Sequence, residues 1–182
     1  MAIWLVDEAG ESLEQRDTFG EKTPLIACGL HRAEDIGLWL IGRGARVDAL
    51  NGGGATALHD ATLSNALRLV EALLAAGARV DVQMAPRLPF FKVLFCVMAL
   101  LRRLGVEDEK VQAFGQTRGC SPLMWCGLWG RPAVAELLLR AGARPSLRNA
   151  NGETAAQIAR QRGFAELAEQ LEAAETSIRT AE

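Results

Sequence analysis

The sequence contains few of the residues on which active sites and metal centres depend. It has two histidines, His31 and His59, and four cysteines in 182 residues. The cysteines form no CxxC pair and no cysteine–histidine ligand spacing, so a zinc site lacks its ligands. GxSxG, HExxH, Walker and GxGxxG motifs are also absent, and Gly52–Gly54 lacks the lysine and the helix spacing of a phosphate-binding loop. We therefore predict no enzyme activity, no metal and no other cofactor.

Long apolar runs and strong net charge are missing as well. The longest apolar run, Leu88–Leu101, is interrupted by Lys92 and is shorter than the roughly 20 residues that span a bilayer. The N-terminal sequence MAIWLVDEAGE has no basic region before its short apolar run, so it is not a signal peptide. A net charge of −2 is too small to indicate nucleic-acid binding. We predict a cytoplasmic protein that binds neither membranes nor nucleic acid, and the excess of arginine over lysine suggests a bacterial source.

What the sequence does contain is a segment that recurs at a regular interval. Thr23, Thr56 and Ser121 each begin a short apolar stretch, and in each case a Gly-Ala pair follows at the same distance along the chain. The step from Thr23 to Thr56 equals the step from Ser121 to a further start at Thr154. A fixed period of about 33 residues, as found here, is typical of a stacked repeat array. Because one helix pair cannot bury its apolar face alone, we predict an all-α solenoid of stacked helix–turn–helix repeats.

Each regular copy contains two short helical patterns. Thr23 is an N-cap candidate, and Pro24 follows at the first helical position, where its missing N–H costs nothing. We interpret His59 as a structural residue whose imidazole links the backbones of neighbouring repeats. The predicted core of the second copy consists of Leu58, Ala61, Leu69, Val70, Leu73 and Leu74.

The cysteines fit the same repeat. Cys28 and Cys126 occupy the small, buried position that Ala61 takes in another copy, so we expect buried thiols there. Cys120 is the cysteine that we expect to be exposed.

The third copy departs from the pattern. The interval from Thr56 to Ser121 falls just short of two periods, and Gly105 follows Leu88 sooner than the regular copies require. Two interpretations are open: the turn between its two helices is shortened, or residues 89–104 form one longer helix. Both leave a long connection that contains the acidic run 107–109 and an additional helical turn at 110–114. We expect this copy to be the least regular part of the fold.

We divide the chain into one array, residues 1–172, and a disordered tail, residues 173–182. The array begins with a half repeat at 1–16, in which Trp4 and Leu5 would pack on the first full copy. The full repeats are 17–50, 51–82, 83–115 and 116–148, and a polar C-terminal cap occupies 149–172.

These residues resemble ankyrin repeat proteins. The resemblance is carried by GxTALHxA at Gly54–Ala61, by SPLMWC at Ser121–Cys126, and by the helix endings EALLAAGARVD and AELLLRAGARP. The histidine of the family motif is present only at His59, and the third copy matches least well. The resemblance implies antiparallel helix pairs, finger loops that project at right angles, and a concave face on which partner proteins bind.

We therefore predict a protein–protein interaction module that is a monomer when free. One version is an inhibitor or immunity-type protein that covers a cognate enzyme or toxin. The alternatives are an adaptor that bridges two proteins and a structural protein that self-associates.

The resemblance places partner contacts on the finger loops and on the ends of the first helices. Trp129 is expected to matter most, because tryptophan often carries interface energy. The alternative for Trp125 and Trp129 is that they fill a gap left by the shortened third copy. The predicted contact residues are Phe19, Leu30, His31, Leu63, Ser64, Met84, Arg87, Phe95, Arg118, Trp125, Trp129 and Arg162.

Overall fold

A computed structural model of the chain describes residues 12–18, 20–106, 108 and 115–181. Over these ranges the chain forms nine helices and no strand, which confirms the all-α prediction. Most of the predicted half repeat, with Trp4 and Leu5, lies outside the described residues, as does Phe19.

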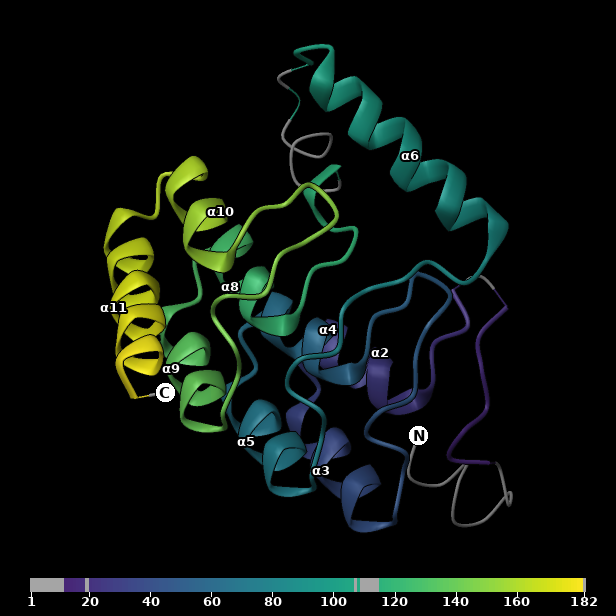
Figure 1. The fold of residues 1–182 in the computed structure, drawn as a ribbon. Helices are drawn as coiled ribbons and strands as arrows, with labels where there is room; N and C mark the ends of the chain where they lie inside the picture. Colours follow the sequence, from purple (N-terminus) through teal and green to yellow (C-terminus); the bar gives the residue numbers. More distant parts are fainter. Residues whose placement is uncertain (1–11, 19, 107, 109–114, 182) are drawn as a thin grey trace.

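Eight of the helices form two rows (Figure 1). Neighbours in the first row pack on one another, and so do α3, α5 and α9 of the second row, while α11 packs on α10. The first row consists of α2 (Pro24–His31), α4 (Ala57–Ser64), α8 (Pro122–Trp129) and α10 (Ala155–Gln161). The second row consists of α3 (Glu34–Gly42), α5 (Leu67–Ala75), α9 (Pro132–Arg140) and α11 (Ala165–Ala181).

Hydroxyl residues and glycines mark the ends of each copy. The side chains of Thr23 and Ser121 each accept a hydrogen bond from the N–H three residues later, at 3.4 Å, and so cap α2 and α8. Gly44, Gly77 and Gly142 follow the second-row helices with φ of +84°, +82° and +85°. Residues with a Cβ rarely adopt this conformation, so these glycines allow the chain to leave each helix toward the next finger loop.

The predicted core positions of the second copy are buried. Leu58, Ala61, Leu69, Val70 and Leu73 are each 0% exposed, while Leu74 is partly buried. The period of the sequence therefore identified the face of each helix that packs against its neighbours.

The cysteine predictions are partly confirmed. Cys28 and Cys126 are buried in the core, as expected. The prediction for Cys120 is wrong: this residue is fully buried, and its thiol donates to the carbonyl oxygen of Gln116 at 2.9 Å. It is buried because the loop before α8 packs against the preceding repeat. Cys96 is the exposed cysteine.

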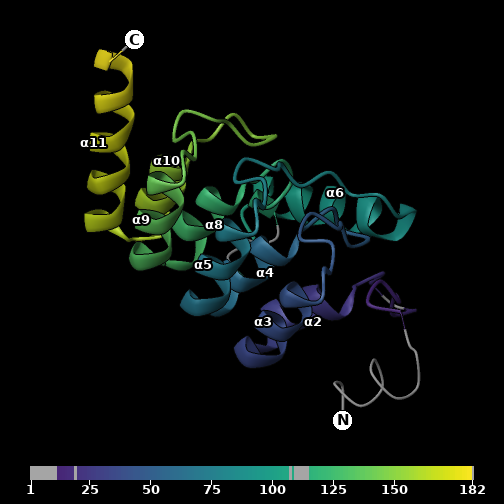
Figure 2. The same cartoon turned by 90° about the horizontal axis from the view of Figure 1, so that it is seen from below.

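Within its described residues 83–106, the third copy forms a single helix instead of a pair. Helix α6 (Pro89–Arg103) has 15 residues, which confirms the second of the two interpretations. It projects away from both rows (Figures 1 and 2), and α4 packs directly on α8. Of the acidic run 107–109 only Asp108 is described, and it is exposed; the predicted helical turn at 110–114 lies outside the described residues.

A repeated contact joins successive finger loops. In each case a carboxylate of one copy accepts a hydrogen bond from the backbone N–H of an arginine in the next. The pairs are Glu14 with Arg46 at 2.8 Å, Asp48 with Arg79 at 3.0 Å, and Asp81 with Arg144 at 3.0 Å. The last pair spans 63 residues. The second and fourth copies are therefore structural neighbours, and α6 emerges from between them.

Small residues decide how closely the first-row helices approach. A Cβ on Gly29 would lie 2.9 Å from the carbonyl oxygen of Ala57, and one on Gly127 would lie 2.5 Å from that of Ala155. The same position in the second copy is Thr62, and the contact between α4 and α8 is the less extensive one. A larger residue at this position is consistent with a wider spacing between α4 and α8.

The C-terminal end differs from the prediction. Helix α11 continues to Ala181, whereas the sequence predicted a disordered tail over 173–182. Residues 165–181 contain no glycine or proline and are rich in alanine and glutamate, so the helix extends beyond its last core residue, Leu171. The polar side chains predicted for the open end are exposed at Gln157, Arg160, Gln161, Glu166 and Glu169.

Candidate functional site

The predicted contact residues do not form one surface. The first-row helices α2, α4 and α8 have eight residues each, so each is about 12 Å long and separates two groups of predicted residues. One group lies at the C-terminal ends of the first-row helices: Leu30, His31, Leu63, Ser64, Trp129 and Arg162. The other group lies on the loop side, before the helices begin: Met84, Arg87 and Arg118.

Three predicted contact residues are part of the core. Met84 and Phe95 are 5% exposed, and Trp125 is 6% exposed. The structure corrects the prediction here, since the protein itself covers these side chains. Trp125 packs edge-on against His59, with ring centroids 5.7 Å apart. Trp125 therefore fills the space between the second and fourth copies, in agreement with the alternative interpretation of this residue.

Trp129 has features of both interpretations, a partner contact and a residue that fills a gap in the core. It is partly buried and packs against the core from the end of α8. Its indole Nε1 is buried and has no hydrogen-bond partner among the described residues.

His59 has the structural role that the sequence indicated. Its Nδ1 accepts a hydrogen bond from the N–H of Thr56 at 3.2 Å, and its Nε2 lies 3.3 Å from the carbonyl oxygen of Cys120. The imidazole therefore carries its proton on Nε2 and joins the second copy to the fourth. Burial lowers the pKa of His59 to about 4, so the ring is neutral at physiological pH.

Helix α6 is held against the array at both ends. The N–H groups of Arg87 and Leu88 donate to the carbonyl oxygen of Gly52 at 2.9 and 3.2 Å. At the other end, Arg102 donates to Glu153 at 2.9 Å. Burial alone would raise the pKa of Glu153, but hydrogen bonds from Asn149 and Arg102 outweigh it, and the pKa is lowered. The carboxylate is therefore ionised and holds the end of α6 in place.

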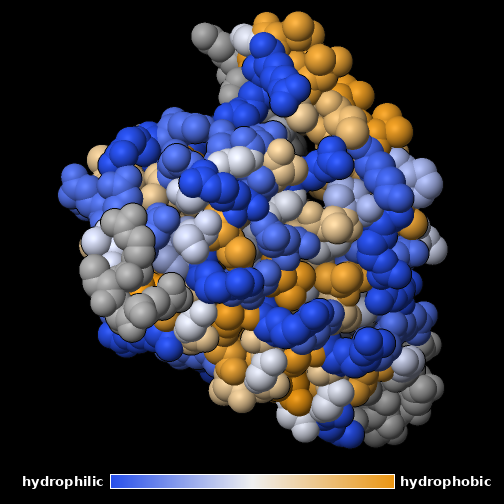
Figure 3. Space-filling view, viewed as in Figure 1, coloured by the Kyte–Doolittle hydropathy of each residue, from blue (hydrophilic) through white to orange (hydrophobic). Residues whose placement is uncertain are grey.

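The outward face of α6 is apolar and exposed. Five large side chains recur along it with alternating steps of three and four residues, the 3.5-residue period of a helix that packs alongside another helix. We call them the α6 stripe: Phe90 (58% exposed), Val93 (64%), Val97 (44%), Leu100 (56%) and Leu104 (71%). They belong to the apolar surface at the top right of the molecule (Figure 3), over α6. Contiguous exposed apolar surface of this kind marks interaction sites in soluble proteins.

A basic groove runs beside α6 on the loop side. It has a volume of about 610 Å³ and contains Lys92, Arg118 and Arg148, with no acidic residue among those that line it. We call this the basic groove. It favours acidic groups, and it includes Arg118 from the predicted contact set.

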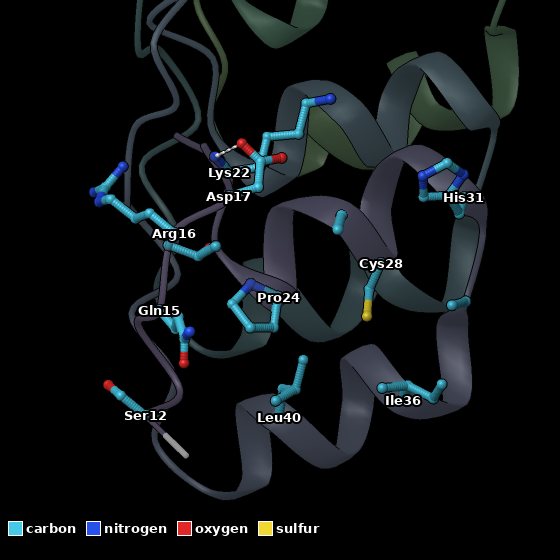
Figure 4. A pocket seen from close by; sticks show the side chains of 13 residues that line it. Ser12, Gln15, Arg16, Asp17, Lys22, Pro24, Cys28, His31, Ile36 and Leu40 are labelled. Atoms are coloured by element: carbon cyan, nitrogen blue, oxygen red, sulfur yellow. Dashed lines mark hydrogen bonds between the residues drawn. The ribbon is translucent and has the colours of Figure 1, made fainter. Parts of the chain in front are cut away.

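A second hollow of about 580 Å³ lies at the end of the stack that α2 and α3 form. Pro24, Cys28, Ile36 and Leu40 line it, and the exposed His31 lies at its edge (Figure 4). Ser12 and Gln15 also line it, and we assign no binding site to it.

Other kinds of site find no support in the described part of the chain. No group of three His, Cys, Asp or Glu side chains there is arranged to hold a metal ion. No helix within the described ranges combines the length and the apolarity needed to cross a membrane.

Comparison with known proteins agrees with the repeat pattern. The family model described as ankyrin repeat matches residues 53–85 and 118–150. No curated protein matches the chain. The two matched stretches coincide with the second and fourth copies, which stack directly on each other in an array of helix pairs, and the chain is therefore an ankyrin repeat protein.

Proposed function

We propose that the chain binds a partner protein mainly through the α6 stripe, with the basic groove as a second contact. Ankyrin repeats generally mediate protein–protein interaction. The observation that carries the proposal for this surface is the α6 stripe, whose side chains are 44–71% exposed although the other face of α6 is already anchored.

The stripe offers a substantial part of the free energy of binding. Full burial of one large apolar side chain stabilises by about 1.5–3 kcal/mol, so covering the exposed parts of five contributes on the order of 4–8 kcal/mol. Association itself consumes part of this gain. A partner that binds firmly must therefore add polar contacts, and the basic groove provides the place for them.

The geometry of the stripe favours a helical partner. The stripe from Phe90 to Leu104 corresponds to about 21 Å of helix. A second helix can lie along such a stripe when its own apolar residues recur with the same period. Acidic side chains at the edge of that helix would reach Lys92 and Arg118. The partner surface is therefore an amphipathic helix with an acidic flank.

Two modes of action are consistent with this surface. In the inhibitor mode, the α6 stripe covers a functional helix of the partner, and one tight surface is sufficient. In the adaptor mode, the group of residues at the C-terminal ends of the first-row helices, which includes Trp129, binds a second protein. The two groups of predicted residues lie on opposite sides of the first row, which is the separation that an adaptor requires.

The direct test is the double variant Val97→Glu/Leu100→Glu. Both side chains are exposed, at 44% and 56%, so the variant is expected to keep the helix content and unfolding midpoint of the wild type. Binding partners captured from host cells should be lost, and the Kd of an isolated partner should rise at least 100-fold. Leu67→Glu, an exposed position on α5, is the matched control and should retain binding. Retained binding by the double variant would refute the α6 surface.

A second test separates the groove from the stripe. Arg118→Glu reverses one charge of the basic groove without touching α6, so it should slow association and weaken its dependence on salt concentration.

Trp129→Ala tests the adaptor mode. Loss of one of two partners with an unchanged unfolding midpoint would support a second surface, whereas a lowered midpoint with parallel loss of both partners would assign Trp129 to packing alone.

A further inference from the structure

A small cavity lies beneath α6, where that helix covers the junction of the second and fourth copies. Its volume is about 180 Å³. Its walls come from parts of the chain that are distant in sequence. They include Lys22 from the loop before α2, Asp60 from α4, Phe91 and Phe95 from α6, and Trp125 from α8.

Two of the residues that line this cavity carry polar atoms without partners. Asp60 is 5% exposed and Trp125 is 6% exposed. The Oδ2 atom of Asp60 and the Nε1 atom of Trp125 are both buried without a hydrogen-bond partner among the described residues. Buried polar groups are normally paired, and an unpaired one costs about 1–3 kcal/mol. An ionised carboxylate only accepts and an indole N–H only donates, so the two groups call for a ligand that carries both a donor and an acceptor.

The aromatic walls favour a positive charge on the donor, whereas Lys22 opposes it. The rings of Phe91, Phe95 and Trp125 line the cavity, and aromatic faces attract ammonium groups. Among the lining residues the charged side chains are Asp60 and Lys22. A water molecule occupies about 30 Å³ in the liquid, so the cavity has room for an organic molecule of about six heavy atoms.

We propose that this cavity binds a small organic cation that also carries a hydrogen-bond acceptor, such as a protonated amino alcohol. The ammonium group lies between the Asp60 carboxylate and the aromatic rings, and the acceptor receives the N–H of Trp125. The site is separate from the α6 stripe, because it uses the inward face of α6.

The ionisation of Asp60 adds a pH dependence. Burial raises the pKa of Asp60 to about 7, and Lys22 opposes this shift. A cation binds the ionised carboxylate, so affinity should increase as the pH rises through about 7. Lys22 competes for the same carboxylate, so its removal should strengthen binding.

The experiment is calorimetric titration of the full chain with protonated dimethylethanolamine at pH 8. Its neutral carbon isostere, 3-methyl-1-butanol, is the matched control ligand. We expect saturable binding of the amine, at least tenfold weaker binding of the alcohol, and at least tenfold loss of amine affinity in Asp60→Asn. Trp125→Phe, which keeps the ring and removes the N–H, should lose affinity several-fold. Lys22→Ala should bind the amine more tightly and serves as the second variant if Asp60→Asn fails to fold.

Three outcomes would overturn the proposal. The first is the absence of saturable binding at amine concentrations up to about 10 mM, roughly ten times the Kd of a weak millimolar ligand. That result would mean that the cavity holds only water. The second is equal binding of the amine and the alcohol, which would show that only apolar volume matters. The third is unchanged amine affinity in Asp60→Asn together with unchanged affinity in Lys22→Ala.

Discussion

The imidazole Nε2 of His59 lies 3.3 Å from the carbonyl oxygen of Cys120, 61 residues further along the chain. Cys120 directly precedes Ser121, the N-cap of α8, so the contact joins the start of the fourth copy to the second. Met84, at the start of the third copy, donates to the same carbonyl at 2.9 Å, while helix α6 takes no part in the contact. The contact accompanies the direct packing of α4 on α8, which leaves α6 outside the stack.

Replacement of His59 should destabilise the array. His59→Ala removes the partner of the Thr56 N–H in a fully buried environment, whereas the Cys120 carbonyl still accepts from the N–H of Met84 at 2.9 Å. One buried group left unpaired costs about 1–3 kcal/mol, so we expect a loss of roughly that size in the free energy of unfolding, measured with urea. His31→Ala, at an exposed position, is the control and should change it by less than about 0.5 kcal/mol. Equal effects of the two substitutions would contradict the link between copies.

The pH dependence of stability should show two opposing contributions from adjacent residues. Burial raises the pKa of Asp60 from 3.8 to about 7, so between these values the folded chain keeps a proton that the unfolded chain releases. As the pH rises through this range, the free energy of unfolding therefore falls by up to about 1.4 kcal/mol per pH unit. Burial lowers the pKa of His59 from 6.5 to about 4, so there the unfolded chain binds the extra proton, and stability rises with pH.

These two slopes should largely cancel between about pH 4 and 6.5 in the wild type. Asp60→Asn removes only the falling contribution. Relative to the wild type, this variant should therefore gain stability progressively as the pH rises from about 4 to 7. Urea unfolding at a series of pH values measures the difference. A difference that does not vary with pH would show that Asp60 titrates normally.

The close approach of α8 and α10 should make Gly127 intolerant of a side chain. A Cβ there would lie 2.5 Å from the backbone oxygen of Ala155, and backbone cannot move aside as a flexible side chain can. We expect Gly127→Ala to lower the free energy of unfolding by about 1–3 kcal/mol. Gly42→Ala, at the end of α3, meets nothing within 4 Å and should be neutral or stabilising by up to about 1 kcal/mol. Chemical denaturation of both variants checks the pair, and an unaffected Gly127→Ala would refute the tight contact.

Two leucines of similar sequence pattern should behave differently. Leu73 on α5 is 0% exposed, and Leu73→Ala should cost about 2–5 kcal/mol by leaving a cavity. Leu100 on α6 is 56% exposed, and Leu100→Ala should change stability by less than about 1 kcal/mol. Thermal and urea unfolding of the two variants give the comparison. A large loss for Leu100→Ala would mean that the α6 stripe supports the fold.

The repeat array itself could be predicted from the sequence. Helix caps such as Thr23 and Ser121, the buried face that includes Leu58 and Leu73, and the structural role of His59 all follow from local chemistry and from a fixed period. The candidate site could be predicted less well. The sequence pattern assigns Met84, Phe95 and Trp125 to a binding surface, yet they are buried. It places Val97 and Leu100 in an ordinary helical run, yet they are exposed.

The sequence by itself determined which residues are apolar, where the helices of the regular copies begin, and that the helix pairs must stack. Only the tertiary structure decided what each apolar face meets. Helix α6 is apolar on two faces, and nothing local distinguishes the face that packs through Phe95 from the face that carries Val97. That choice depends on the packing of α4 directly on α8, a contact between segments that are distant in sequence. The burial of Trp125, the exposure of the α6 stripe and the cavity beside Asp60 all follow from that contact.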